Sequence, residues 1–181
     1  PAAPTKCAAN DRATVKGRVK DVQHTKPLEL DSFLLKCIRE FCELVVPEAH
    51  VLVPVDHEDV YEKQNRPSQR RNLQEAEEYG PYYRKNVVKC FQKGEAYGKF
   101  SWPRNITTIN PKDKLEYSRY CYALADHLKR RCQWYTFGKT PIEISQRIAM
   151  ICQCAEYVTL GDFSKMDGHV SNVGRLLTSS I

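Results

Sequence analysis

The pattern of hydrophobic and polar residues along the chain predicts three amphipathic helices. The first covers residues 30–46, where apolar side chains recur every three or four positions and Asp31 or Ser32 can cap the N-terminus. The second covers residues 113–131, and the third runs from residue 140 to about residue 155. The positions available for the buried face of the second helix are Leu115, Tyr120, Leu124 and Leu128.

The third helix has the clearest start signal. Thr140 can cap it, Pro141 fits the first helical position, and Glu143 completes a capping box. A polar, basic connector over residues 61–71 is expected to lead into a short helix near residues 73–79, which the following Gly-Pro pair ends.

Four short runs have β character, and they cover residues 51–55, 87–91, 105–109 and 157–160. The last run is expected to be a buried strand with Asp162 just beyond its end. Residues 1–29 are polar, contain few aromatic residues and show no clear period, which predicts an extended N-terminal arm. The expected fold is therefore α/β (α+β) and helix-rich, with short strands.

Charge adds a possible partner to this picture. The formal net charge is +6, and six of the 28 basic residues lie in residues 84–104, a stretch with one acid, Glu95. Basic residues that alternate with aromatic residues suit a surface that meets phosphates and bases together. The alternative is a solvated charged face whose aromatic residues belong to a core.

Three other kinds of site receive no support. The eight cysteines form no Cys-x-x-Cys pair and no zinc-finger quartet, so reduced thiols are expected rather than a zinc site. Gly138-Lys139-Thr140 lacks the glycine that a P-loop needs at position 133, which is Gln133. The apolar runs are too short to span a membrane, so no membrane contact is expected from this segment itself.

Two aspartates, Asp162 and Asp167, follow the last predicted strand. Nucleotidyl transferases hold two Mg²⁺ ions with carboxylates at rigid strand ends, although a capping aspartate and a surface aspartate also explain such a pair. The surrounding sequence, Asp-Phe-Ser-Lys-Met-Asp-Gly-His-Val-Ser over residues 162–171, closely resembles the first palm motif of positive-strand RNA virus polymerases. The resemblance is strongest to the nodavirus-like group.

This resemblance implies roles for both aspartates as catalytic residues. Asp162 would bind the catalytic Mg²⁺ (or Mn²⁺) together with the backbone carbonyl of Phe163. Asp167 would bind the nucleotide by sensing its ribose 2′-hydroxyl, which favours ribonucleotides, whereas reverse transcriptases usually carry a bulky aromatic residue there. Gly168 is expected to let the chain turn tightly behind Asp167.

A second resemblance lies in residues 91–107, which look like the fingers motif above the nucleotide tunnel of the same polymerases. It implies that Lys93 and Arg104, with Lys99 as a third cation, bind the triphosphate of the incoming nucleotide. Arginine suits this role because its planar guanidinium donates two parallel hydrogen bonds to phosphate oxygens. Glu95 is expected to be an ion-pair partner that fixes this loop, and the alternative for the lysines is simple solvation.

The resemblance covers about residue 30 to the end and implies an incomplete right-hand polymerase fold. Residues 1–29 would form the arm, residues 30–155 the fingers, and residues 156–181 the start of the palm with its first strand. A polymerase also needs a Gly-Asp-Asp motif, and none occurs in this sequence. The 181 residues are therefore expected not to polymerise alone, and exposed strand edges are expected to promote aggregation.

The expected function is that of a part of an RNA-directed RNA polymerase, a viral replicase that copies viral RNA by two-metal nucleotidyl transfer. The expected partners are the RNA template, the nascent RNA, ribonucleoside triphosphates and the rest of the viral replicase. The expected location is the host cytoplasm, at membrane-associated replication complexes reached through other parts of the protein. The alternative is a non-catalytic module that binds single-stranded RNA.

Overall fold

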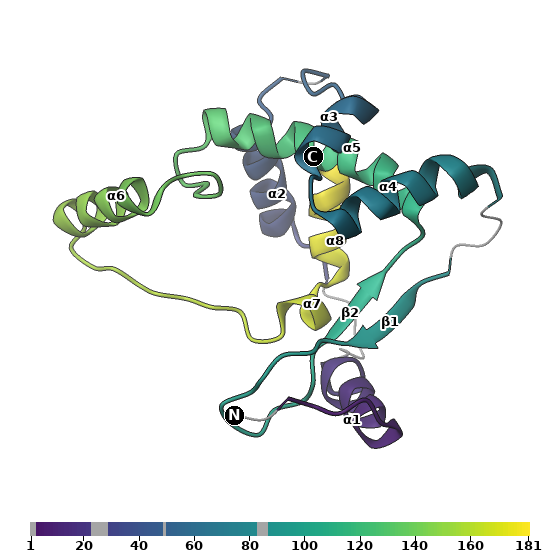
Figure 1. Ribbon diagram of the computed structural model, residues 1–181. Coiled ribbons are helices and arrows are strands. Elements are labelled where there is room, and N and C mark those ends of the chain that lie inside the picture. Colours follow the sequence, from purple (N-terminus) through teal and green to yellow (C-terminus); the bar gives the residue numbers. More distant parts are fainter. Residues whose placement is uncertain (1–2, 23–28, 49, 83–86) are drawn as a thin grey trace.

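The computed structural model describes residues 3–22, 29–48, 50–82 and 87–181 (Figure 1). Helices dominate this part of the chain and a single two-stranded sheet accompanies them, which confirms the predicted helix-rich class with short strands. The helices and turns are α1 (Ala8–Arg18), η1 (Lys20–Val22), α2 (Ser32–Val45), α3 (His57–Lys63), α4 (Pro67–Tyr79), η2 (Gly80–Tyr82), α5 (Pro111–Arg131), α6 (Pro141–Cys154), α7 (Met166–His169) and α8 (Asn172–Ser180).

The main core lies between α3, α4 and α5. Its buried side chains are Val60, Leu73, Ala76 and Leu115. The helix α5 begins as its sequence indicates, since the Asn110 side chain accepts a hydrogen bond from the backbone N–H of Asp113 and Pro111 follows the cap. Leu115 confirms the predicted buried face, but Tyr120 is 60% exposed, so that part of the prediction is wrong. The apolar stripe of α5 is narrower than the spacing alone suggested.

The helix α2 confirms the first prediction, and Asp31 is its cap. The Asp31 carboxylate accepts a hydrogen bond of 2.7 Å from the backbone N–H of Leu34. At the other end of α2, the carbonyl oxygen of Val45 lies 2.9 Å from Nε2 of His127 in a buried contact with α5. This contact connects α2 to the central helix.

Residues 51–55 do not form the predicted strand. The backbone N–H of Val55 donates to the carbonyl oxygen of Arg119, and the Arg119 side chain donates to the carbonyl oxygen of Val55 over 2.8 Å. The backbone polar groups of Val55 are therefore satisfied by α5 rather than by a neighbouring strand.

The predicted polar connector is largely helical, so this prediction is also wrong. Asp56 caps α3 by accepting a hydrogen bond from the backbone N–H of Asp59, and α4 starts at Pro67 rather than near residue 73. The Gln69 side chain also accepts a hydrogen bond from the backbone N–H of Arg66. These local start signals outweigh the polar composition.

The two central predicted strands are confirmed. Strand β1 (Lys89–Gln92) pairs antiparallel with β2 (Asn105–Thr108), in a register that places Lys89 opposite Thr108 and Gln92 opposite Asn105. Strand β2 leads directly into α5, which contributes Leu115 to the main core, so the core anchors this end of the hairpin (Figure 1). Residues 93–104 form the loop at its tip.

The N-terminal segment is not the predicted extended arm, because α1 and η1 occupy most of its described residues. The sequence gives little sign of this helix, since its buried positions are Thr14 and Gly17 rather than large apolar side chains. The helix lies along the hairpin loop at the bottom of the view in Figure 1. Tertiary packing against that loop, described below, therefore holds a helix that has no hydrophobic stripe of its own.

The C-terminal part contains one confirmed and one wrong prediction. The capping box of α6 is present, with Thr140 and Glu143 each accepting a hydrogen bond from the backbone N–H of the other. Residues 157–160, however, form no strand, and Leu160 is 93% exposed. A strand needs a neighbour for its backbone groups, and within the described ranges the only sheet is the β1–β2 hairpin. Both α6 and this segment stand apart from the rest of the fold (Figure 1).

A search of the described helices for one both long and apolar enough to cross a membrane finds none.

Candidate functional site

Two cations and one carboxylate meet at the tip of the hairpin. Nζ of Lys93 lies 2.7 Å from one carboxylate oxygen of Glu95, and Nη1 of Arg104 lies 3.3 Å from the other. We call these three residues the Lys93–Glu95–Arg104 cluster. The expectation that Glu95 is an ion-pair partner within this loop is confirmed.

Backbone pairing explains why these residues meet. The last pair of the sheet is Gln92 with Asn105, and the backbone N–H of Lys93 extends the ladder by donating to the carbonyl oxygen of Arg104 over 2.7 Å. Lys93 and Arg104 are therefore opposite each other at the point where the strands end. A turn follows, in which the backbone N–H of Glu95 donates to the carbonyl oxygen of Lys93.

The hydroxyl of Tyr97 fixes the carboxylate between the two cations. It donates to Oε1 of Glu95 over 3.0 Å and accepts a hydrogen bond of 2.9 Å from the backbone N–H of Arg104. The hydrogen bond from Lys93, followed by that from Tyr97 and the charge of Arg104, lowers the pKa of Glu95 below its ordinary value. The cluster thus carries two positive charges and one negative charge, and about half of the Arg104 side chain (53%) is exposed.

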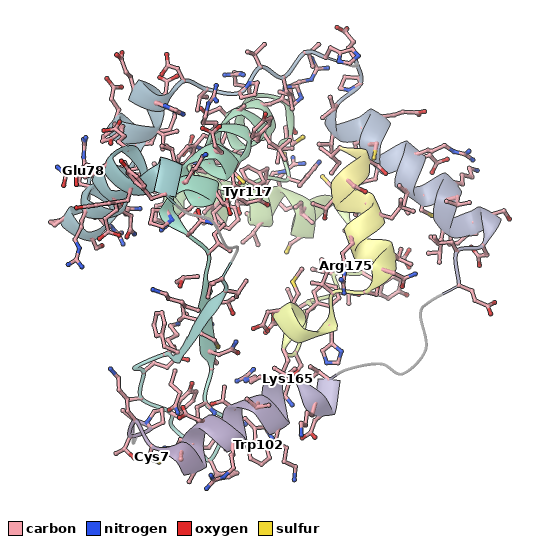
Figure 2. The ribbon with its side chains drawn as sticks, turned by 90° about the vertical axis from the view of Figure 1, so that its right-hand side faces the viewer. Cys7, Glu78, Trp102, Tyr117, Lys165 and Arg175 are labelled. Carbon is pink, nitrogen blue, oxygen red and sulfur yellow. The ribbon has the colours of Figure 1, made fainter. Side chains whose placement is uncertain are left out.

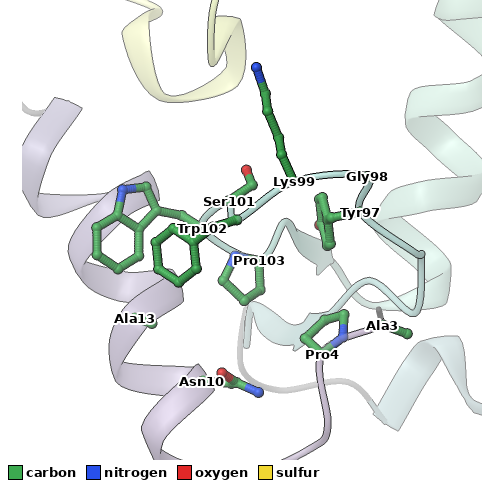
Figure 3. A pocket seen from close by; sticks show the side chains of 11 residues that line it. Ala3, Pro4, Asn10, Ala13, Tyr97, Gly98, Lys99, Ser101, Trp102 and Pro103 are labelled. Atoms are coloured by element: carbon green, nitrogen blue, oxygen red, sulfur yellow. The ribbon is translucent and has the colours of Figure 1, made fainter. Parts of the chain in front are cut away.

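Lys99 lies on the same loop but apart from the cluster. Its side chain is exposed and, within the described part of the chain, pairs with no acid. Figure 3 shows Lys99 extending away from a hollow of about 500 Å³ that the loop forms with the N-terminal end of α1. The sequence does not indicate this hollow, because its two walls lie far apart along the chain.

Trp102 holds the loop to α1. A Cβ atom at Gly17 would overlap the Trp102 ring, so only glycine leaves room for the ring there. Nζ of Lys16 lies 5.8 Å from the ring centroid, and Nη2 of Arg18 donates to the Trp102 carbonyl oxygen over 3.1 Å. Figure 2 shows Trp102 against this helix.

The predicted aspartates lie in the C-terminal segment. Asp162 and Phe163 are exposed on the irregular chain before α7, and Asp167 is within α7. The left-handed residue of this turn is Lys165, with φ of 52°, rather than Gly168. The prediction that Gly168 is needed for a tight turn is therefore wrong. A glycine is needed there because neighbouring atoms leave no room for a side chain.

Gly168 lies against the end of the N-terminal helix. A Cβ atom there would come within 2.5 Å of Cγ2 of Val22 and 2.9 Å of the carbonyl oxygen of Arg18. Real Cβ atoms essentially never approach other atoms this closely. The turn that carries Asp167 is therefore packed on α1 and η1.

The residues of the predicted metal site are of the right kind but few in number. Carboxylate and carbonyl oxygens suit Mg²⁺, which takes six oxygen ligands, and Asp162 with the Phe163 carbonyl would supply two of them. In the described part of the chain no three His, Cys, Asp or Glu side chains gather into a group that could hold a metal ion. No hydrogen bond or ion pair among these residues joins Asp162 or Asp167 to the Lys93–Glu95–Arg104 cluster.

Comparison with known proteins gives consistent matches. The chain is 32% identical over 173 residues to the RNA-directed RNA polymerase of Atlantic halibut nervous necrosis virus and 34% identical over 169 residues to that of Pariacoto virus. The RNA-directed RNA polymerase of Pieris rapae virus is 32% identical over 165 residues. These alignments cover 91%, 93% and 87% of the chain respectively.

The same alignments cover only 17%, 17% and 16% of the three relatives, so the chain spans less than a fifth of the length of the curated relatives it matches. No family model matches the chain, and no solved structure matches it significantly. The resemblance drawn from the two motifs is nevertheless confirmed along most of the sequence. The chain belongs, as one segment, to the nodavirus-like RNA-directed RNA polymerases.

Proposed function

We propose that this chain supplies the triphosphate-binding loop and the first metal-binding aspartate of a viral RNA-directed RNA polymerase. Its partners would be the RNA template, the nascent RNA, ribonucleoside triphosphates and the rest of the replicase, and its location the host cytoplasm. The observation that carries the proposal is the Lys93–Glu95–Arg104 cluster, which presents two fixed cations at the tip of a hairpin. The named relatives are all RNA-directed RNA polymerases, which supports the same reading.

The cluster suits a triphosphate for electrostatic and geometric reasons. Arg104 can donate two parallel hydrogen bonds to phosphate oxygens, and Lys93 adds a compact positive charge beside it. Glu95 holds both side chains close together before the nucleotide arrives, so the nucleotide need not bring them together. Lys99 is free to approach from the exposed side of the loop.

The aspartates would complete the nucleotide site from the C-terminal segment. Asp162 and the Phe163 carbonyl would hold Mg²⁺ (or Mn²⁺), with the other ligands coming from the substrate phosphates and from carboxylates beyond the described residues. When bound, two such ions activate the attacking hydroxyl and neutralise charge on the triphosphate. The Asp167 carboxylate would accept a hydrogen bond from the network that holds the ribose 2′-hydroxyl.

Replacing Asp162 tests this proposal. In a polymerase that contains this segment, Asp162→Asn keeps the shape of the side chain but weakens a metal ligand, so RNA synthesis should fall by orders of magnitude while RNA binding is retained. Glu156→Gln is the matched control, because Glu156 is an exposed acid six residues earlier in the same irregular segment. Unchanged synthesis by the Asp162→Asn protein would remove Asp162 from the metal site.

The exposed aromatic residues of the loop favour a second candidate function. Phe100 is 90% exposed and lies beside Trp102, with ring centroids 5.9 Å apart, and Lys16 lies over the Trp102 ring. Such a surface could stack the bases of single-stranded RNA without any catalysis. In that case Phe100→Ala would weaken RNA binding by this chain by about 1–3 kcal/mol, and Asp162→Asn would leave every measured activity unchanged.

A further inference from the structure

The N-terminal helix touches both parts of the proposed nucleotide site. On one side α1 packs against the loop that carries Lys93 and Arg104, and on the other its end packs against the turn that carries Asp167. Figure 2 shows Trp102 and Lys165, which mark these two segments, beside the same helix. The sequence motifs that identify the polymerase site do not include any residue of α1.

The contact with the loop has three parts. Gly17 leaves room for the Trp102 ring, Arg18 donates a hydrogen bond to the Trp102 carbonyl oxygen, and Lys16 lies over the ring. A fourth contact joins the helix to the base of the loop, where the Gln92 side chain donates to the Asp11 carboxylate. The loop is thus held along about two turns of α1.

The contact with the aspartate turn is close and involves backbone atoms. Val22 is buried, with 4% of its surface exposed, and its Cγ2 lies against Gly168. The carbonyl oxygen of Arg18 lies against the same glycine. Arg18 therefore contacts the loop with its side chain and the turn with its backbone.

We propose that α1 and η1 are a positioning element that holds the nucleotide-binding loop at a fixed place relative to the aspartate turn, with Gly17, Arg18 and Val22 as positioning residues. This inference rests on the proposed function, because it concerns how two parts of that site are kept in register. The helix has few apolar residues to bury, so its packing on these two segments is what keeps it in place. Any shift of α1 would move both parts of the site.

The physical link can be tested in this chain without any polymerase activity. In a Trp134→Phe background Trp102 is the only tryptophan, and its fluorescence reports how its ring is packed. Gly17→Ala should expel the ring and increase its quenching by acrylamide. Gly168→Ala, placed on the other contact, should also increase quenching through its effect on Arg18.

Gly98→Ala is the matched control for both variants. Gly98 lies in the same loop with no other atom within 4 Å of the added Cβ, so quenching should not change. Far-UV circular dichroism checks that α1 remains helical, which alanine favours over glycine. An unchanged Trp102 signal in the Gly168→Ala protein, with the helix intact, would overturn the proposed link.

The functional consequence is tested in a polymerase that contains this segment. Gly17→Ala should raise the KM for ribonucleoside triphosphates by about tenfold or more, because displacement of a site by about 1 Å is costly, while affinity for RNA stays unchanged. Gly17→Ala should add nothing in a Trp102→Ala background, where the ring it expels is already absent. An unchanged nucleotide KM, or an equal loss of RNA affinity, would overturn the positioning role.

These outcomes are separable from failure of the proposed function. If Asp162→Asn leaves synthesis intact while Gly17→Ala raises the nucleotide KM, the assignment of the metal ligand fails and the positioning role stands. If Asp162→Asn abolishes synthesis while Gly17→Ala leaves KM unchanged, the positioning role fails and the assignment of the metal ligand stands.

Discussion

The small core between α3, α4 and α5 lies next to the base of the β1–β2 hairpin, and Leu115→Ala tests how much this core contributes to stability. Leu115 is 5% exposed and lies among Val60, Leu73 and Ala76. It belongs to the first turns of α5, a few residues after β2 ends. Shortening this side chain should therefore weaken both the helix packing and the attachment of the hairpin.

The expected loss can be estimated from the packing. Leucine-to-alanine changes in protein cores cost about 2–5 kcal/mol, and more where the surroundings cannot collapse into the cavity. This core is small and is bordered by the half-buried side chains of Val55, Tyr61 and Tyr122, so partial collapse is available. We expect a loss of about 2–3 kcal/mol in the free energy of unfolding, or a fall of about 5–10 °C in Tm.

Urea unfolding followed by circular dichroism measures this loss, and Leu44→Ala is the matched control. Leu44 is also a leucine in a helix, but it is 62% exposed, so its replacement should change stability by no more than about 0.5 kcal/mol. Equal effects of the two substitutions would refute the account of the core. Hydrogen exchange should also show faster opening of β1 and β2 in the Leu115→Ala protein.

Four further predictions follow from the site and the helix ends. Glu95→Gln removes the anion between Lys93 and Arg104, so the two cations should separate in the free protein and the KM for nucleotides should rise. A lower KM would count against the idea that Glu95 holds the cations ready for the nucleotide. The hydrogen bond from Lys63 lowers the pKa of Asp126 below its ordinary 3.8. This carboxylate therefore stabilises the fold above about pH 4, and the stabilisation is lost as the pH falls through the lowered pKa. Asp126→Asn should flatten that part of a plot of Tm against pH. Thr140→Ala should cost the start of α6 about 1 kcal/mol, seen as faster hydrogen exchange there, and unchanged exchange would mean that the cap is unimportant. A primer-extension assay on the 181 residues should detect no RNA synthesis, and templated product would contradict the expectation drawn from the missing Gly-Asp-Asp motif.

The parts of the fold that the sequence predicts well are those whose causes are local. The start of α6 depends on three neighbouring residues, and the hairpin depends on two β-rich runs separated by a loop with glycine and proline. The Lys93–Glu95–Arg104 cluster follows from the same hairpin, because pairing of the strands brings its members together. Local signals are therefore enough to predict the proposed triphosphate-binding part of the site.

The parts that the sequence predicts poorly depend on distant partners. Helix α1 buries small residues against Trp102, whose backbone accepts a hydrogen bond from Arg18 across 84 positions, so no periodic pattern reveals it. Residues 157–160 have strand character but no neighbouring strand in the described part of the chain, so the pattern alone could not decide their structure. The sequence does not reveal the role of Gly168 for the same reason, because the atoms that exclude a side chain there belong to α1 and η1.

Under the proposed function, Asp162 binds the catalytic metal ion of an RNA polymerase, and metal-directed cleavage of the chain tests this directly. In a polymerase that contains this segment, Fe²⁺ can replace Mg²⁺ and, with ascorbate and peroxide, cleaves the backbone close to the metal-binding site. We expect nucleotide-dependent cleavage within residues 160–168 that disappears in the Asp162→Asn protein and persists in the Glu156→Gln protein. Cleavage that avoids these residues, or that is unchanged by Asp162→Asn, would contradict it.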